Sequence, residues 1–214
     1  MSAPLFEVGV IFSNNAPLVQ PFFFLLRQSS RVPFRVLVVN QGSVDETAEC
    51  VARELRGTDR VVTYPDNRGC AGGRNRILHL RNPSLPLFLL DSDCLVARSG
   101  TCEALLAALK THALAYSRQR GFHFGDIAGR GYSAAMFRPD VFEKLGGFDE
   151  NCRMFFDDTL HAEALNRAGL PWVTVETAEV LHIWGSTTRV DPKWQEVLER
   201  DRAYYEKVRI KEPA

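Results

Sequence analysis

Four times in its first 110 residues, the chain alternates a short apolar run with a segment of helical periodicity. The apolar runs are residues 5–12, 34–39, 60–64 and 87–90, and the helical segments begin near residues 15, 45, 72 and 101. Strands that alternate with helices pair in parallel, because each helix returns the chain to the same end of the sheet. The pattern predicts an α/β fold with a mostly parallel central sheet flanked by helices.

The second half of the chain is less regular. We expect strands at residues 113–116, 132–137, 172–175 and 179–182, and helices at residues 140–145, 157–168 and 192–207. Residues 118–130 show no period and are typical of a loop that faces a second substrate or moves. A length of 214 residues with 45% hydrophobic content suits one well-buried unit, so a single domain over residues 1–214 is expected.

The charge balance narrows the function classes. Lys+Arg 26 against Asp+Glu 26 gives no net charge, which argues against a nucleic-acid partner, because such proteins need a basic surface to displace counterions. No leader peptide opens the sequence and no apolar run has the length of a transmembrane segment, so we expect a cytoplasmic protein. The five cysteines form no Cys-x-x-Cys pair and have no neighbouring histidine at zinc-site spacing, which indicates reduced thiols.

Two carboxylates follow the most apolar of the expected strands. If the backbone stays extended after Leu90, Asp91 and Asp93 point to one side and Ser92 to the other. Ligands of α/β sheets bind beyond the carboxyl ends of the strands, and paired carboxylates there can hold a hard cation that bridges phosphate oxygens. A plain turn, in which these side chains bond nearby backbone amides, is the alternative interpretation.

A glycine-rich stretch, residues 65–75, follows the third strand. Glycine allows a ligand to approach the backbone closely. A helix over residues 72–80 would present its first amides and Arg74 to an anion such as a diphosphate. A tight turn followed by a helix cap fits the same residues.

Five motifs occur in a fixed order along the chain. They are VGVIFSNN at residues 8–15, VVNQGSVDET at 38–47, NRGCAGGRN at 67–75, LLDSD at 89–93, and the stretch from GGFDE to FDDTL at 146–160. Together they resemble the GT-A fold glycosyltransferases, and within them the family 2 enzymes that use nucleotide sugars. The resemblance spans nearly the whole chain and implies one Rossmann-like GT-A domain, with a nucleotide-sugar-binding half at residues 1–95 and an acceptor and catalytic half at residues 96–214.

The resemblance implies an inverting, metal-dependent enzyme of the hexosyltransferase type. Such an enzyme moves a sugar from a nucleoside diphosphate sugar, here with UDP favoured, to an acceptor hydroxyl. The cation is Mn²⁺ or Mg²⁺. The acceptor is not readable from the sequence: a glycan, a lipid-linked sugar, a peptide or a small molecule each offers a hydroxyl.

By the same resemblance, Asp93 is the direct metal ligand, and Asp91 faces the ribose or the water shell of the metal. His182 completes the metal site, although a histidine at a strand end is also a common structural residue. Asp158 is the general base, and Asp157 beside it raises the proton affinity of the pair, while both also suit the start of a helix. The implied donor-binding residues are Ser13, Asn14, Asn40, Gly42, Asn67, Gly69, Gly72, Gly73, Arg74, Asp91 and Ser92.

The sequence departs from the family pattern at two positions. Asn40 stands where an aspartate usually reads the pyrimidine imide; an amide can still accept from N3–H and donate to a carbonyl, so uracil or thymine fits and guanine is not excluded. Leu160 replaces a frequent acid. These departures leave the base and the sugar of the donor open.

Three other classes of function compete with the glycosyltransferase interpretation. A nucleotidyltransferase would carry a lysine-bearing glycine loop after the first strand, where this chain has Ser13 and Asn14. A dinucleotide-dependent dehydrogenase would carry Gly-x-Gly-x-x-Gly there. A catalytically inactive nucleotide-binding or scaffold protein of the same fold has no physical need for Asp93, Asp158 and His182 together, and it remains the alternative to the enzyme.

Overall fold

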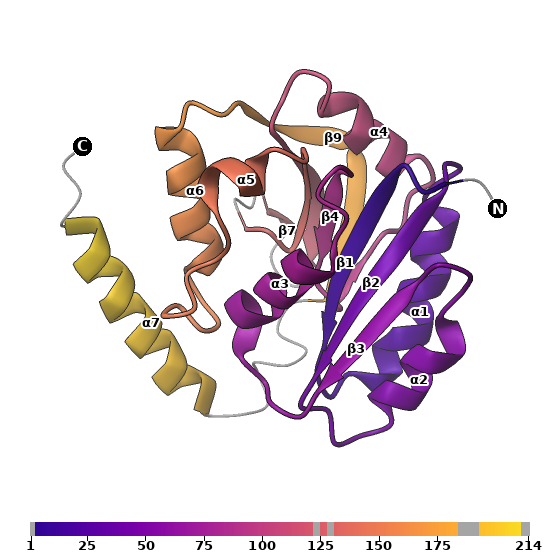
Figure 1. Ribbon diagram of the computed structural model, residues 1–214, viewed down its shortest axis with the longest axis horizontal. Coiled ribbons are helices and arrows are strands. Elements are labelled where there is room, and N and C mark those ends of the chain that lie inside the picture. The colour runs from indigo at the N-terminus through magenta and orange to yellow at the C-terminus, as the bar shows by residue number, and fades with distance from the viewer. Residues whose placement is uncertain (1–2, 122–124, 128–130, 184–192, 211–214) are drawn as a thin grey trace.

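The computed structural model describes residues 3–121, 125–127, 131–183 and 193–210. Its strands form one sheet in the order β3-β2-β1-β4-β8-β6-β9-β5, with β7 paired to β6 (Figure 1). The strands are β1 (Phe6–Phe12), β2 (Phe34–Gln41), β3 (Arg60–Tyr64), β4 (Leu87–Leu90), β5 (Cys94–Leu95), β6 (Leu114–Gly121), β7 (Gly125–Ile127), β8 (Ala134–Phe137) and β9 (Trp172–His182). The helices are α1 (Ala16–Gln28), α2 (Thr47–Glu54), α3 (Gly69–Leu80), α4 (Thr101–Ala108), α5 (Val141–Leu145), α6 (Asp157–Arg167) and α7 (Lys193–Ile210).

The first half forms the parallel part of the sheet. Strand β1 pairs in parallel with both β2 and β4, and β2 pairs in parallel with β3. The register opposes Phe12 to Asn40, so the carboxyl ends of β1 and β2 lie level at one edge of the sheet. The longest registers of the sheet are parallel, while β8 is antiparallel to both β4 and β6. The predicted α/β fold is confirmed.

Each face of the sheet carries its own hydrophobic core. Alternate β1 residues such as Phe6 and Val8 pack with α1, α2 and α4, whereas Leu37 and Leu89 pack with α3, α5 and α6. Burying one such side chain contributes about 1.5 to 3 kcal/mol, so this two-sided burial is a main source of stability. The buried stripe of α1 is Val19, Phe22, Phe23 and Leu26.

Helix α3 lies unusually close to β1. A Cβ atom added at Gly9 would lie 2.5 Å from Ile77 Cγ2, and one added at Gly73 would lie 2.6 Å from Ile11 Cδ1. Distances of that size are steric overlaps, so a glycine on each surface is needed for this approach. The start of α3 is thereby held against the carboxyl end of β1.

The second half differs from expectation in two places. Residues 118–121, expected in a loop, extend β6 and pair with β7; residues 122–124 and 128–130 of that loop lie outside the described part of the chain. Residues 172–182, expected as two strands, form the single strand β9. Its register with β6 shifts after the Ser117↔Val175 pair, where Arg118 pairs with Glu179, and this irregularity interrupts the apolar pattern.

Helix α7 packs along α6 and the loop before it (Figure 1). The rings of Phe156 and Tyr205 stack with centroids 5.0 Å apart. The carboxylate of Asp201, fully buried, accepts hydrogen bonds from the backbone N–H groups of Met154 at 2.8 Å and Phe155 at 3.1 Å. These contacts tie α7 to the loop that leads into Asp157.

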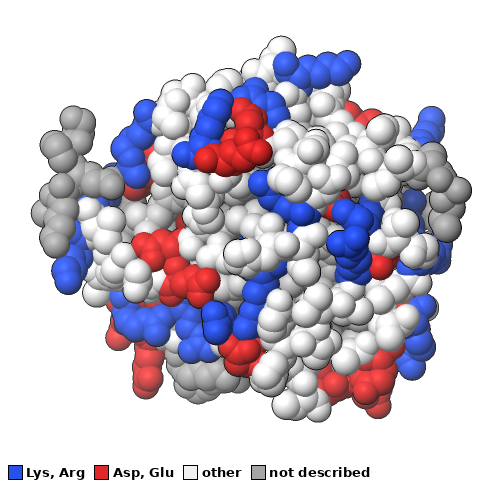
Figure 2. Space-filling model, viewed as in Figure 1, with Lys and Arg blue, Asp and Glu red and all other residues white. Residues whose placement is uncertain are grey.

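The surface shows no dominant sign of charge on the face drawn in Figure 2, where acidic and basic side chains are interspersed. Within the described ranges, no helix combines the length and apolar character that crossing a bilayer requires.

Candidate active site

A buried arginine joins the two acidic motifs at the carboxyl edge of the sheet. The side chain of Arg74, on α3, is only 4% exposed. Its Nη1 donates to Asp157 Oδ2 at 2.7 Å, and its Nη2 lies 3.4 Å from Asp91 Oδ1. Residues that lie far apart in the sequence are therefore held around one guanidinium group.

Burial and mutual attraction shift the pKa values of Arg74, Asp157 and Asp91. Burial raises the pKa of Asp157 to about 7; Arg74 opposes this rise and the neighbouring Asp158 adds to it. Burial likewise raises the pKa of Asp91 against the effect of Arg74. Burial disfavours the charge of Arg74, but Asp157 and Asp91 outweigh it and raise the arginine pKa. The arginine stays cationic, and its carboxylate partners bind protons more readily than free aspartates.

Asp158, the expected base, has surroundings quite different from those of Asp157. It is half-buried and accepts hydrogen bonds from the backbone N–H of Tyr132 at 3.2 Å and of Thr159 at 2.7 Å. A Cβ atom added at Gly131 would lie 3.2 Å from Asp158 Oδ2, so the glycine leaves room beside the carboxylate. Of the two adjacent acids, the buried Asp157 is paired with Arg74, while Asp158 is partly exposed to solvent.

The structure brings Asp93 and His182 together as expected. The distance from His182 Nε2 to Asp93 Oδ1 is 3.3 Å. His182 Nδ1 lies 3.0 Å from Gln119 Oε1, a carbonyl oxygen that accepts the Nδ1 proton, so that Nε2 is the ring nitrogen on the side of Asp93. A carboxylate and an imidazole fit Mn²⁺, while Mg²⁺ prefers oxygen ligands alone. Gln119, on β6, was not predicted, because only the β6–β9 pairing brings it to His182.

Asp91 does not join that pair. The expectation that Asp91 and Asp93 share one site assumed an extended backbone, but a turn begins at Asp91, whose carbonyl accepts the N–H of Cys94 at 2.9 Å. The Asp91 N–H donates to Ser133 O at 2.8 Å, and its side chain faces Arg74. Strand alternation stops at Leu90, so the two carboxylates do not project together, and the role of Asp91 towards the ribose or the water shell of the metal stays a prediction.

A polar network lines the ends of β1 and β2. Ser43 Oγ donates to Asn40 Oδ1 at 2.5 Å and accepts from the backbone N–H of Asn14 at 3.1 Å. Asn67 Nδ2 donates to Ser13 Oγ at 3.0 Å. Asn40 is 1% exposed, and its Nδ2 has no hydrogen-bond partner among the described residues. Buried donors are almost always paired, so this N–H is suited to a carbonyl oxygen of a ligand.

Two further predicted donor-binding residues, Ser92 and Gly42, follow the ends of β4 and β2. Ser92 Oγ accepts from the Nδ2 of Asn15 at 3.0 Å, which connects the turn after β4 to the start of α1. Gly42 adopts a φ of +64°, a conformation that glycine tolerates best, and its N–H donates to Tyr64 O at 3.0 Å.

The helix in the glycine-rich stretch begins earlier than expected. Helix α3 begins at Gly69 rather than at residue 72, so Gly72 and Gly73 lie inside it. Gly73 packs on Ile11 as described above, and a Cβ atom at Gly72 would overlap the side chain of Arg68. These two glycines allow close packing, and the guanidinium group of Arg74 binds the carboxylates of Asp157 and Asp91. Direct contacts of Gly72, Gly73 and Arg74 with a diphosphate stay a prediction.

The first turn of α3 is instead covered by another loop. Gly69 has a φ of +75°, and a Cβ atom there would overlap the backbone carbonyl of Arg153. The Gly69 N–H donates to Asn67 Oδ1 at 2.7 Å, and Arg153 donates through Nη2 to Asn67 O. The loop before α6 thus rests on the predicted donor-binding stretch.

A second buried network supports this arrangement and was not predicted. Gln41 donates through Nε2 to Gly69 O at 2.9 Å and accepts from Arg76 Nη1 at 3.2 Å. Arg76 also pairs with Asp66 at 2.7 Å. The available signal was a second arginine, two residues after Arg74, inside a segment otherwise rich in small residues.

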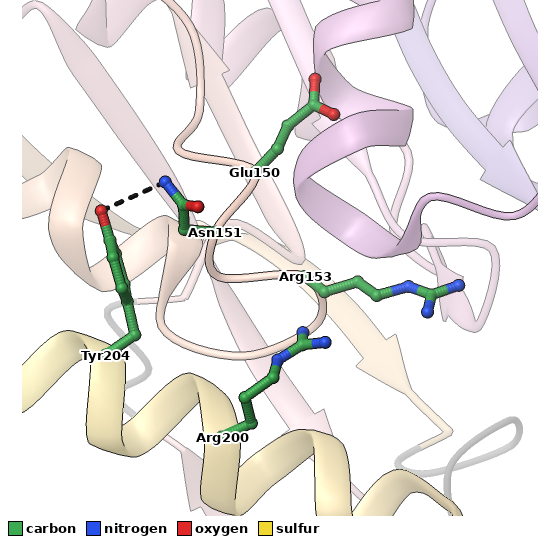
Figure 3. Close-up of a pocket in the computed structure, with 5 residues that line it drawn as sticks. All are labelled: Glu150, Asn151, Arg153, Arg200 and Tyr204. Atoms are coloured by element: carbon green, nitrogen blue, oxygen red, sulfur yellow. Dashed lines mark hydrogen bonds between the residues drawn. The ribbon is translucent and has the colours of Figure 1, made fainter.

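A polar pocket adjoins this region on the side of α7 and contains none of the predicted site residues. Its lining is Glu150, Asn151, Arg153, Arg200 and Tyr204. Figure 3 shows Arg200 reaching from α7 towards the loop that carries Arg153, and Asn151 Nδ2 donating to Tyr204 Oη, at 3.2 Å.

Comparison with known proteins gives a family and a fold. The sequence model described as glycosyl transferase family 2 matches residues 7–162. Among curated proteins, no sequence match was found. The mannosyltransferase PcManGT from Pyrobaculum calidifontis, solved with GDP-Man and Mn²⁺, superposes with a TM-score of 0.74 at 19% identity, over 100% of this chain and 66% of that chain.

Two other solved structures are similar. TarS 1-349 from S. aureus, in complex with UDP, has a TM-score of 0.69 at 15% identity, over 92% of this chain and 64% of that chain. Glucosyl-3-phosphoglycerate synthase from Mycobacterium tuberculosis, in complex with Mn²⁺, UDP and glucosyl-3-phosphoglycerate, has a TM-score of 0.68 at 14% identity, over 94% and 77%. The chain spans about two thirds of the length of PcManGT and of TarS 1-349. At these identities the likeness shows the fold.

Proposed function

This chain belongs to glycosyl transferase family 2, and from that membership we propose that it is an inverting, metal-dependent glycosyltransferase. In the proposed reaction, a nucleoside diphosphate sugar, with UDP favoured, gives its sugar to an acceptor hydroxyl. The observation that carries the proposal is the double contact of Arg74 with Asp157 and Asp91, which holds the two acidic motifs at one site. The contact places carboxylates of both motifs around one buried cation.

The metal-holding residues in this proposal are Asp93 and His182. A bound Mn²⁺ or Mg²⁺ supplies positive charge that stabilises the departing diphosphate. Gln119 holds the His182 ring with Nε2 towards Asp93, and the backbone carbonyl of Asp93 is itself fixed by the N–H of Ile183 at 2.8 Å.

Asp158 is the proposed base. Its carboxylate takes the proton of the acceptor hydroxyl while that oxygen attacks the anomeric carbon from the side opposite the diphosphate, and one such displacement inverts the configuration. The backbone N–H groups of Tyr132 and Thr159 orient it. Asp157 binds Arg74, so in this proposal it positions α6 and does not exchange the proton itself.

Asn40 is the proposed reader of the base. Its free Nδ2–H is suited to a ring carbonyl, and its Oδ1 retains a second lone pair for an imide N–H. Both uracil and guanine offer such a pair of groups. The relatives also differ: PcManGT was solved with GDP-Man and TarS with UDP.

Calorimetric titration tests the donor site. We expect UDP to bind more tightly with Mn²⁺ than in a chelator, and this gain to disappear in Asp93→Ala but persist in Asp140→Ala, a change at a partly exposed acid that pairs with Arg138. Equal affinity with metal and with chelator contradicts the metal site. Tighter binding of GDP than of UDP would change the base assignment and leave the fold and the metal site standing.

A further inference from the structure

A buried thiol lies beside the Asp93–His182 pair. Cys94 on β5 is the direct antiparallel partner of His182 on β9. Directly opposed residues of an antiparallel pair project from the same face of the sheet. One ligand atom each from Asp93, Cys94 and His182 lies within 4.8 Å of the others. The three side chains therefore form one cluster of an oxygen, a sulfur and a nitrogen donor.

This donor set differs from what the proposed transfer reaction needs. Mg²⁺ favours oxygen donors and Mn²⁺ favours oxygen and nitrogen donors, whereas Zn²⁺ binds thiolate, imidazole and carboxylate with tetrahedral geometry. We propose that Asp93, Cys94 and His182 form a zinc site, in which the Cys94 sulfur gives Zn²⁺ an advantage over Mn²⁺. On binding, the thiol proton passes to solvent and the sulfur forms the Zn–S bond. The proposal adds Cys94 to the two residues assigned above to the catalytic metal, and zinc binding itself does not require sugar transfer.

The backbone around the cluster is fixed on both sides. The Cys94 N–H donates to Asp91 O at 2.9 Å, and the Ile183 N–H donates to Asp93 O at 2.8 Å. His182 Nδ1 faces Gln119 Oε1 at 3.0 Å, the kind of outer partner that metal-binding histidines usually have. Zinc bonds are roughly 2.0 to 2.3 Å long, so binding would draw the three donor atoms towards one another. With three protein ligands, the fourth position of a tetrahedral ion stays open.

Cobalt provides a direct readout of the sulfur. We expect Co²⁺ added to the metal-free protein to give the near-ultraviolet absorption band of thiolate-to-cobalt charge transfer, and Zn²⁺ to abolish that band by displacement. Cys94→Ser and His182→Ala should lack the band. Cys102→Ser should keep it, because Cys102 is equally buried but lies 3.4 Å from Ser29 Oγ, in another part of the core.

Competition with a chelator then measures metal selectivity. Cys94→Ser should weaken Zn²⁺ binding by about tenfold or more and leave Mn²⁺ binding unchanged. The absence of the cobalt band in the unaltered protein, its persistence in Cys94→Ser, or an equal loss of Zn²⁺ and Mn²⁺ affinity would each overturn the proposal. Circular dichroism checks that the variants fold. If Cys94→Ser does not fold, Cys94→Ala replaces it. The presence or absence of the cobalt band in the unaltered protein tests the proposal independently of either variant. Mn²⁺-dependent UDP binding would survive any of these failures, so they are distinct from failure of the proposed function.

Discussion

At the residue level, adjacent aspartates have opposite surroundings. Asp157 is 1% exposed and binds Arg74, while Asp158 is half-buried and bound by backbone N–H groups. A buried arginine without a partner would cost several kcal/mol, so Asp157 is committed to holding that charge. This leaves Asp158 as the member of the pair that can exchange a proton with a substrate.

The first residue-level prediction concerns Asp158. Asp158→Asn should lower kcat by about 10²- to 10⁴-fold and change donor affinity little, because an amide cannot take the acceptor proton. Asp140→Asn is a matched control at the N-terminus of α5 and should keep full turnover. Turnover is followed by release of nucleoside diphosphate, and NMR of the product should show an inverted anomeric centre. Near-full activity of Asp158→Asn, or a retained configuration, contradicts the assignment.

The second residue-level prediction concerns the buried ion pair of Arg74 and Asp157. Asp157→Ala should lower the free energy of unfolding by about 3 to 5 kcal/mol, because it removes the closest partner of a buried charge. Asp158→Ala should cost only about 1 kcal/mol, as for loss of backbone hydrogen bonds at a helix start. Urea unfolding of both variants gives the comparison. Similar small losses would show that Arg74 does not depend on Asp157.

At the level of secondary-structure elements, the start of α3 is set by contact with the loop before α6. Gly69 has a positive φ and meets the Arg153 backbone, and Gly73 lets the helix lie on β1. Asp201 on α7 fixes the other side of the same loop through two backbone N–H groups. Helices α3, α6 and α7 are thus positioned together around the loop that leads into the two aspartates.

Comparing Gly69 with Gly100 distinguishes the energetic cost of a positive φ from the cost of a steric overlap. Gly69→Ala and Gly100→Ala each place a side chain at positive φ, with φ values of +75° and +83°, which costs about 1 to 2 kcal/mol. A Cβ atom at Gly100 meets nothing within 4 Å, while one at Gly69 overlaps a backbone carbonyl that cannot rotate away. Urea unfolding should therefore show Gly69→Ala to be less stable than Gly100→Ala by about 1 to 3 kcal/mol. Equal losses would mean that the loop moves away freely.

At the level of the whole molecule, the buried His161 of α6 packs against Phe142 of α5 and Phe137 of β8. The His161 ring stacks on Phe148 with centroids 4.8 Å apart, and its Nδ1 lies 3.1 Å from Tyr132 Oη. Burial lowers the pKa of His161 from 6.5 to about 4. The histidine is therefore neutral in the folded state at pH values where the unfolded chain binds a proton.

This difference predicts how stability depends on pH. As the pH falls from about 6.5 to about 4, the unfolded state takes up a proton that folded His161 does not, so the free energy of unfolding decreases, by at most about 3 kcal/mol. Asp157, whose pKa is raised to about 7 by burial, acts in the opposite direction in the same range. The quantity to measure is therefore the difference in pH dependence of urea unfolding between the unaltered protein and His161→Gln. His79→Gln, at an exposed histidine, is the control and should show no difference. The same slope in His161→Gln as in the unaltered protein would refute the role of His161.

The sequence by itself determined the α/β fold, the order of strands and helices in the first half, and the motifs that lead to family 2. These depend on periodicity and on short motifs, which are properties of neighbouring residues. Asp93 with His182, and the acidic pair at the start of α6, also followed from such motifs. The division at residue 95 and the roles of the site residues stay predictions.

The tertiary structure decided which of these residues meet. Asp91 faces Arg74 because the backbone turns after Leu90 instead of staying extended, and Gly73 lies inside α3 against β1 because the helix begins at Gly69. Cys94 reached His182, although the spacing of cysteines and histidines in the sequence gave no sign of a shared site, because the register of β5 on β9 opposes them. Such contacts depend on the pairing of distant strands, and local sequence periodicity carries no information about that register.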